Sequence, residues 1–506
     1  MVMPYALKGH VLGVINLRKC ERDQSNNTIR DISMSTHESQ LRFYGGAGAS
    51  ILPTLIYVAG TVILSVGFHF SSMKNLTFSA MAGMLIGFFF CKEKKIYWNT
   101  IVQGIAQVGN IRLLVAFLLI GVFTTLLMGG NISGGLVWLC LAMGINSHEF
   151  VLFVFIASAV ISMGTCAPIA ALFSVVPIFY PPGILMGITP ELLAGAMLSG
   201  VFFGDALSPC SQLTQMTLFS QHDSPESEPA LLTTLLKSRL PAVLITGLIS
   251  LVLFGLMPQG NGVGDTSLHD IQHFGDVLGL WMLLPLAVLL AFGFRTQNLF
   301  LSLNVAILVG LVTGLLCGSI RWEQIISIDY HARNLHGVIF DGVNSMTDIV
   351  VSTLLLYGLI SLAKEGGCVS LLCNWISKKN LTHSPKGTEW VISLGIAVTN
   401  ILLSGSALPA ILMFSPVSEW LGQQSGVNAC NRCWLLLSVA SSFTAIIPLN
   451  SVFMMGMVTL IQTMTQHYPW LPPINPFNTF AFSFYCLLLT LACVLHLMMK
   501  KSHRQK

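Results

Sequence analysis

The chain has 506 residues, of which 54% are hydrophobic and only 9% are charged, and its mean hydropathy is +0.75. Soluble domains average roughly 25% charged residues, so this composition excludes an ordinary soluble protein and indicates one that lies in the lipid bilayer. The formal net charge of +4 is too small to indicate a nucleic-acid partner. Long apolar runs without alternation favour an all-α polytopic membrane protein over a β-barrel.

The first 49 residues are polar and basic and precede the first apolar run. They carry six lysines and arginines, which predicts a cytoplasmic N-terminus. The chain does not begin with an apolar core followed by a small-residue cleavage site, so we do not expect an ordinary cleaved signal. Met34 is an alternative translation start, and residues 1–33 would then be an extension without a folded role.

Apolar runs that are candidates for whole or interrupted membrane spans follow in order: 50–70, 77–91, 112–129, 150–180, 185–204, 240–257, 277–294, 297–318, 347–363, 388–417, 433–465 and 477–498. Because an interrupted run can be a hairpin or a single crossing, we expect roughly 11–13 spans. The basic stretches 92–95 and 364–387 predict cytoplasmic loops. We expect 319–345 to be a long polar loop.

The stretch 200–217 is the centre of the functional prediction. Asp205 lies at the end of an apolar run, and Pro209 breaks the helix shortly afterwards. The polar residues that follow have helical spacing and are expected to share one face: Ser208, Ser211, Gln212 and Gln215. A carboxylate beside freed backbone carbonyls predicts a cation site. A bend that only packs helices is the alternative, but carboxylates inside membranes are usually functional.

Two parts of the chain repeat the same order of segments. Residues 112–217 and 348–462 each contain an uninterrupted apolar span followed by two interrupted spans. The first repeat follows a basic loop, whereas the second follows a loop expected on the outside, so their topologies are opposite. Paired broken segments in inverted halves predict a substrate site near the bilayer midplane.

This pattern divides the chain into six parts: 1–49 as a polar basic extension, 50–111 as leading spans, 112–220 as the first transport repeat, 221–347 as connecting spans and loops, 348–465 as the second transport repeat, and 466–506 as the last span and a basic tail.

The breaks also carry a family resemblance. Residues 203–214 read Phe-Gly-Asp-Ala-Leu-Ser-Pro-Cys-Ser-Gln-Leu-Thr, which resembles the Gly-Asp-x-x-Ser-Pro-x-Ser-Asp-Thr-Thr motif of the NhaC family of sodium/proton antiporters. Other segments similar to this family occur in its order: Gly164-Thr165, Gly342 to Met346, Ser404-Gly-Ser406, Ile447 to Asn450, and Pro473 to Phe477. An ordered series of this kind is more specific than any single motif.

The resemblance implies a secondary carrier with two inverted halves that performs sodium/proton antiport by alternating access. Asp205 would bind the proton or a sodium ion, which is the one metal ion expected. The oxygen ligands would come from all the broken segments: Ser208, Ser211, Thr214, Thr165, Ser404, Ser406 and Asn450. No cofactor is implied.

The chain departs from the family motifs at several acidic positions. Gln212 and Asn344 stand where the family has an acid, and Leu437-Ser438 stands where an acidic pair usually occurs. The charge of the site therefore changes, and two alternatives stay open: a cation- or proton-coupled exchanger of a small organic solute, or a divergent membrane scaffold that does not transport. No HExxH or P-loop motif is present, so we do not expect an enzyme. The expected location is the cell inner membrane, with a homo-oligomer as an open possibility.

Overall fold

The computed structural model describes residues 41–499 apart from 209–210, 222–227, 258–274, 297, 330–333, 369–370, 372–383, 404, 449–450 and 466–467. The prediction for residues 1–33 lies outside the described residues, as do two of the expected site residues, Ser404 and Asn450.

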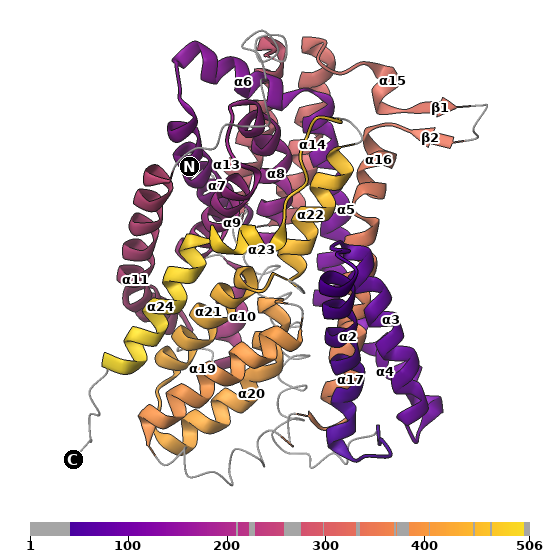
Figure 1. The fold of residues 1–506 in the computed structure, drawn as a ribbon, viewed down its shortest axis with the longest axis vertical. Helices are drawn as coiled ribbons and strands as arrows, with labels where there is room; N and C mark the ends of the chain where they lie inside the picture. The colour runs from indigo at the N-terminus through magenta and orange to yellow at the C-terminus, as the bar shows by residue number, and fades with distance from the viewer. Residues whose placement is uncertain are drawn as a thin grey trace, which may run out of the picture.

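The described chain is almost entirely helical, as the composition predicts (Figure 1). The first half contains η1 (Ala47–Ile51), α2 (Leu52–Val62), η2 (Ile63–Gly67), α3 (Met73–Phe90), α4 (Lys94–Ile105), α5 (Val108–Gly129), α6 (Ile132–Met143), α7 (Ser147–Thr165), α8 (Pro168–Leu185), α9 (Pro190–Leu207), α10 (Gln212–Gln221) and α11 (Glu228–Leu256). The second half contains η4 (Val277–Met282), α13 (Leu283–Thr296), α14 (Leu299–Cys317), α15 (Trp322–Ile325), β1 (Ser327–Asp329), β2 (Asn334–His336), α16 (Val338–Ser345), α17 (Thr347–Glu365), α19 (Pro385–Leu402), α20 (Ala407–Ser425), α21 (Ala429–Ile446), α22 (Val452–Met464), α23 (Pro476–Ala481) and α24 (Phe484–Met499).

The helices confirm an all-α, multi-pass membrane protein. In the described part of the chain, ten helical segments are long and apolar enough to cross a membrane, and three shorter helices (α6, α22 and α24) are also apolar. Ten is fewer than the expected 11–13, because some broken runs are divided into helices that are too short or too polar to qualify alone.

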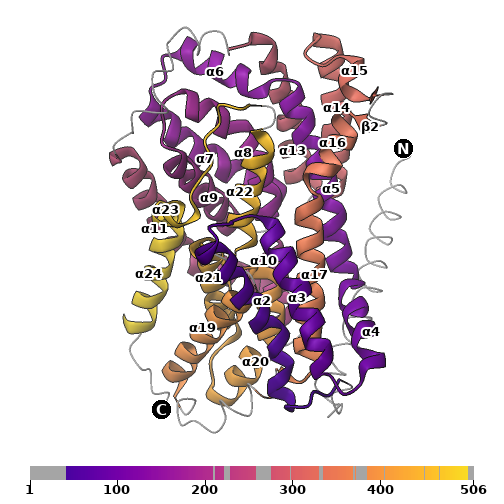
Figure 2. The same cartoon turned by 45° about the vertical axis from the view of Figure 1, so that its right-hand side comes forward.

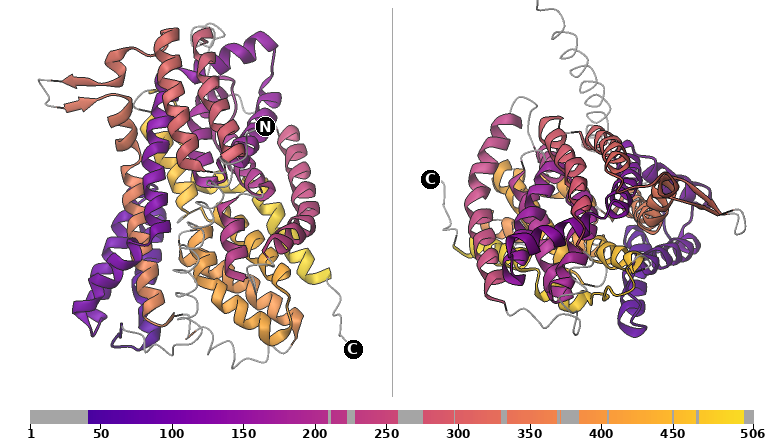
Figure 3. Two further views of the ribbon diagram at one scale, coloured as in Figure 1. Left: turned by 180° about the vertical axis from the view of Figure 1, so that it is seen from behind. Right: turned by 90° about the horizontal axis from the view of Figure 1, so that it is seen from above.

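Two expected boundaries are wrong, whereas the interruption expected near 164–168 in the run 150–180 is confirmed. This run is two helices, α7 and α8, because Cys166 adopts a left-handed conformation that ends the first of them. The span expected to start at 240 begins at Glu228, since α11 continues through Pro241. The stretch 319–345 is not only a loop: it holds α15, the antiparallel hairpin of β1 and β2, and α16. Figure 3 shows this hairpin projecting from the helical body.

The segment α4–α5 runs antiparallel to α16–α17, and α17 begins the second predicted repeat. The Ser361 hydroxyl near the end of α17 donates a hydrogen bond to the Thr100 carbonyl of α4, at 2.9 Å. Further along, Gly121 of α5 lies directly against the backbone of Gly342 in α16. Figure 2 shows the three helices α5, α16 and α17 side by side. This antiparallel arrangement fits the expected inversion of the two halves.

The broken segments pack in the same pattern in both halves. In the first half α7 packs against α9, and in the second half α19 packs against α21. Across the halves, α8 packs against α22, and α10 packs against α20. Figures 1 and 2 place α8 and α22 in the upper part of the molecule and α10 and α20 in the lower part. The helix after the first break of each half therefore packs against the helix after the second break of the other half.

Helix α8 is fully buried although it contains three internal prolines. Each proline lacks the N–H that would bond the carbonyl four residues earlier. Neighbouring helices supply two of the missing donors. The Thr124 hydroxyl of α5 donates to the Phe173 carbonyl at 3.2 Å, and the Ser133 hydroxyl of α6 donates to the Pro177 carbonyl at 3.0 Å.

One end of the molecule gathers basic residues. The backbone N–H of Lys92 donates to the carbonyl of Arg42 at 2.9 Å, which places the link between α3 and α4 beside the start of the described chain. Ser50 in η1 lies against Gly366, just after α17. The stretch 92–95 and the segment that begins at Lys364 therefore lie at the same end.

Candidate functional site

Asp205 lies near the C-terminal end of α9, where this helix packs tightly against α7. Gly200 and Gly204 are one turn apart and face the backbone of α7 at Phe155 and Ala159. Small residues at this spacing let two membrane helices approach closely. Asp205 follows directly and is only 2% exposed, so the close approach places a carboxylate in the protein interior.

The helix ends where the proline pattern predicts. α9 stops at Leu207, and Ser208 is extended (φ −77°, ψ 118°). The first break of this half lies alongside: the Gln212 N–H donates to the Cys166 carbonyl at 3.0 Å. The Ser208 hydroxyl donates to the Met163 carbonyl at 3.4 Å. The two broken segments of the first half therefore meet at one place.

Five of the expected ligands gather at this meeting point. Asp205 and Thr165 are buried, and so are three polar residues after the break: Ser208, Ser211 and Thr214. The Ser211 side chain lies within hydrogen-bonding reach of the Asp205 carboxylate. The carboxylate oxygen Oδ1 has no hydrogen-bond partner within the protein, so it is available to a ligand.

The expected single polar face is wrong. Ser208 and Ser211 are buried, whereas Gln212 and Gln215 are exposed. The offset rule for a helix face does not apply across residues 208–211, because α10 begins only at Gln212. The hydroxyls therefore face the interior near Asp205, while the two amides lie on the other side.

The second half has a corresponding meeting of breaks. Gly405 has a positive φ of 57°, and a Cβ added there would lie 3.1 Å from the Cβ of Ser451, which is a tight contact. Ser451 directly precedes α22. Ser406 is half-buried at the start of α20. The Ser451 hydroxyl donates to the Thr444 carbonyl at 2.6 Å. Ser406 thus occupies the break in the second half that corresponds to Thr165 in the first.

The donor set around Asp205 suits a hard monovalent cation. It combines one carboxylate, hydroxyl oxygens and the ends of broken helices, which are the ligands that coordinate sodium or a proton in carriers with discontinuous helices. In the described residues no group of three or more His, Cys, Asp and Glu side chains is placed to hold a metal ion.

Sequence reasoning missed Arg239. This residue lies on α11 and is 3% exposed, and its Nε and Nη2 atoms have no hydrogen-bond partner within the protein. It is close enough to Asp205 for the two charges to interact. Arg239 was passed over because the apolar run was expected to begin at 240, one residue after it. The signal that would have found it is the helical spacing that continues upstream to residue 230.

Arg432, the other arginine below one-tenth exposure among the described residues, is fully engaged. Its Nε donates to the Gln221 side-chain oxygen at 2.8 Å, and its Nη1 donates to the Val427 carbonyl at 2.8 Å. The Gln221 amide in turn donates to the Ser415 carbonyl at 2.9 Å. This network ties α10 to α20 and α21, so Arg432 is structural, in contrast to Arg239.

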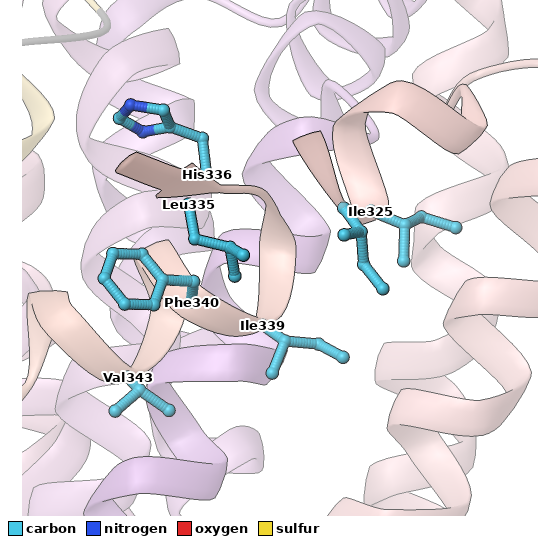
Figure 4. A pocket seen from close by; sticks show the side chains of 7 residues that line it. Ile325, Leu335, His336, Ile339, Phe340 and Val343 are labelled. Carbon is cyan, nitrogen blue, oxygen red and sulfur yellow. The ribbon is translucent and has the colours of Figure 1, made fainter. Parts of the chain in front are cut away.

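Two cavities lie away from Asp205. Figure 4 shows one of about 250 Å³ between the hairpin and α16, lined mainly by apolar side chains such as Leu335 and Phe340. The other, of about 360 Å³, includes Glu191 at the start of α9. Asp205 follows Glu191 by fourteen positions on the same helix, which is about 21 Å at the usual rise. Neither of these two cavities therefore reaches Asp205.

Comparison with known proteins finds similarity to a curated protein and to solved structures. No family model matches the chain. A malate-2H(+)/Na(+)-lactate antiporter of Bacillus subtilis (strain 168) is 25% identical over 336 residues, which cover 63% of this chain and 66% of that protein. The chain thus aligns with slightly less than two thirds of this relative.

Two solved structures are similar to this chain at low TM-scores. The YdaH transporter of Alcanivorax borkumensis has a TM-score of 0.40 and 15% identity, covering 78% of this chain and 89% of its own. MtrF of Neisseria gonorrhoeae, from a class of antimetabolite efflux pumps, has a TM-score of 0.38 and 14% identity, covering 80% and 83%.

Proposed function

We propose that this protein is a secondary antiporter that works by alternating access, and that Asp205 binds the coupling ion. The observation that carries the proposal is the buried Asp205 carboxylate at the meeting of two broken segments, with Oδ1 unpaired. Carboxylates in such positions are the usual sites of ion and proton binding in membrane carriers. The similarity to an antiporter supports the same class of activity.

Sodium/proton antiport is the first candidate. The Gly-Asp-x-x-Ser-Pro pattern at 204–209 supports a divergent relationship to the NhaC family. Sodium and a proton would compete for the Asp205 carboxylate, and the buried hydroxyls of Ser208, Ser211 and Thr214 would supply oxygen ligands. Thr165 and Ser406, with Ser404 and Asn450, would complete the site as the two repeats at 112–220 and 348–465 rearrange.

Exchange of a small organic solute coupled to sodium or protons is the second candidate. Two observations favour it. The relative carries organic acids together with sodium and protons, as its name states. The buried and unpaired Arg239 beside Asp205 is not needed for cation exchange alone, and it supports an additional ligand.

The clustered basic residues orient the protein. Arg42, Lys92 and Lys364 lie at one end of the molecule. Positively charged loops are retained on the cytoplasmic side, so we place this end in the cytoplasm and the helices in the cell inner membrane. The N-terminus would then also be cytoplasmic.

Replacement of Asp205 tests the proposal. Asp205→Asn keeps the size and hydrogen bonding but removes the charge, so coupled transport in proteoliposomes should fall at least tenfold while the protein stays monodisperse. Asp205→Glu should keep part of the activity, because the charge remains and only its reach changes. Asp348→Asn is the matched control, since Asp348 lies in the first turn of α17 and is partly exposed.

The assay uses sodium, proton and organic-ion gradients in one panel. If Asp205→Asn transports as fast as the parent with the same pH profile, the carboxylate is structural and the mechanism is wrong. If the parent protein carries nothing in the panel, the scaffold alternative is favoured over antiport.

A further inference from the structure

Arg239 is the feature of the described chain that an ion site at Asp205 does not explain. It lies in a helical segment long and apolar enough to cross the membrane, and it is 3% exposed. A guanidinium stays charged in proteins, and an uncompensated buried charge is strongly unfavourable. Charged residues within membrane spans therefore belong to a functional pathway or pair with a partner.

The unpaired atoms of Arg239 define the geometry of that partner. Nε and Nη2 have no hydrogen-bond partner within the protein, and these two nitrogens lie on one edge of the planar guanidinium. This edge presents two roughly parallel N–H groups, with which arginine binds both oxygens of a carboxylate at once. The free edge therefore favours a planar ligand with two acceptor oxygens.

The surrounding helices add further hydrogen-bonding groups. Helix α11 packs against α9, α21 and α24. On α24, Tyr485 and Cys493 are close enough to Arg239 to interact with its charge. The Tyr485 hydroxyl and the Ser438 hydroxyl of α21 are buried, and the Tyr485 hydroxyl has no partner within the protein. Ser438 lies beside Cys493, so the hydroxyls of Tyr485 and Ser438 both lie in the neighbourhood of Arg239.

This cluster holds a buried positive charge with unpaired donor atoms. Nε and Nη2 of Arg239 have no hydrogen-bond partner within the protein, and each nearby hydroxyl can donate one O–H as well as accept. Asp205 is the one carboxylate among the described residues that is shown to interact with the charge of Arg239. A buried guanidinium with a free edge favours an anionic ligand, because charge-assisted hydrogen bonds to an anion compensate both the charge and the unpaired N–H groups.

We propose that Arg239 binds the carboxylate group of a small organic acid through Nε and Nη2, with the Tyr485 hydroxyl as a further donor. The inference rests on the antiport proposed above and names the chemical class of its organic solute. Asp205 stays available for the coupling cation, so the organic anion and the cation occupy adjacent positions.

The charges of Arg239 and Asp205 link binding of the organic anion to binding of the cation. The positive charge of Arg239 opposes binding of a cation at Asp205. A bound carboxylate neutralises Arg239 and removes this opposition, so anion and cation each bind more tightly when the other is present. Because such coupling is reciprocal, sodium should raise the affinity for the carboxylate by the same factor as the carboxylate raises the affinity for sodium.

The test measures binding of lactate and malate to the purified full chain, with and without sodium, and uses the uncharged lactamide as a ligand control. Arg239→Gln and Arg239→Lys should each weaken carboxylate binding about 10- to 100-fold, as expected for lost hydrogen bonds to a charged group. Lysine keeps the charge but lacks the two-pronged edge. Arg295→Gln, at the exposed end of α13, is the matched control and should bind as the parent does.

Two further variants keep the proposal testable if the Arg239 variants do not fold. Tyr485→Phe removes only the hydroxyl, and Ser438→Asp places a carboxylate of the protein itself near Arg239, so both should weaken binding of the organic acid. Unchanged affinity in the folded variants overturns the proposal. It is equally overturned if the parent binds lactamide as well as lactate.

The outcomes separate this inference from the proposed antiport. If the parent exchanges sodium for protons through Asp205 and binds neither lactate nor malate, the carboxylate site is wrong while antiport stands. If Asp205→Asn leaves carboxylate exchange and its ion coupling unchanged while Arg239→Gln abolishes carboxylate binding, the ion site is wrong and the carboxylate site stands.

Discussion

Gly204 offers the most direct test of how Asp205 is positioned. In the structure this glycine lies so close to the backbone of α7 that an added Cβ would overlap the carbonyl group of Ala159. Backbone cannot move aside as a flexible side chain can, so Gly204→Ala must push α9 away from α7. Overpacking of this kind costs about 1–3 kcal/mol, and alanine returns about 0.8–1.0 kcal/mol through its better helix propensity.

A second glycine that faces the same helix separates these two contributions. Gly255 of α11 lies beside Leu152 of α7, and a Cβ there would be at an ordinary contact distance of 3.7 Å. Gly255→Ala should therefore show little more than the propensity gain. The free energy of unfolding, measured by denaturant titration in mixed micelles, should differ between the two variants by about 1–3 kcal/mol or more. Equal stabilities within about 0.5 kcal/mol would refute the close α7–α9 contact, because surface-like substitutions stay within that range.

Further predictions concern the ends and the buried polar groups. Single cysteines introduced at Lys92 and Lys364 should react with a membrane-impermeant maleimide only after the membrane is opened, and labelling of either in sealed cells would contradict the shared cytoplasmic side. Burial raises the pKa of the Cys368 thiol to about 11 from its usual 9.0. Near pH 8 this thiol should therefore react with a maleimide about 100-fold more slowly than a thiol of ordinary pKa. Its reaction rate should rise with pH until about pH 11, and a rate that does not change with pH would contradict its burial. Gln221→Met removes the acceptor of Arg432 Nε and should lower the free energy of unfolding by about 1–3 kcal/mol, while the exposed Gln424→Met should change it little; equal values would show that the network is not stabilising.

The sequence predicts the membrane class and the break after α9 because both depend on local properties. A low share of charged residues and long apolar runs are sufficient for the all-α class, and Pro209 is sufficient to end α9 near Leu207. The position of Asp205 in the interior follows from the same run. The gathering of Thr165, Ser208 and Ser211 around it depends on packing between α7 and α9, which a repeat pattern suggests but does not specify.

The surroundings of Arg239 could not be predicted in the same way. The apolar run was expected to begin at 240, whereas α11 begins at Glu228 and packs against α9, α21 and α24. Tyr485 and Ser438 join the cluster from distant parts of the chain, and no spacing rule connects them. The exposure of Gln212 likewise depends on where α10 begins, which is set by the geometry of the break.

The prolines of α8 have a consequence for how the protein can move. A regular helix carries its own hydrogen-bond ladder and can slide or tilt without assistance from its neighbours. Helix α8 instead depends on hydroxyls of α5 and α6 for the carbonyls of Phe173 and Pro177. If it separated from them, these carbonyls would be unsatisfied in an apolar interior. The three helices should therefore move as one rigid body. Relative motion is then expected at interfaces such as the one between α8 and α22, where the Phe173 side chain lies against the α22 backbone at Gly456.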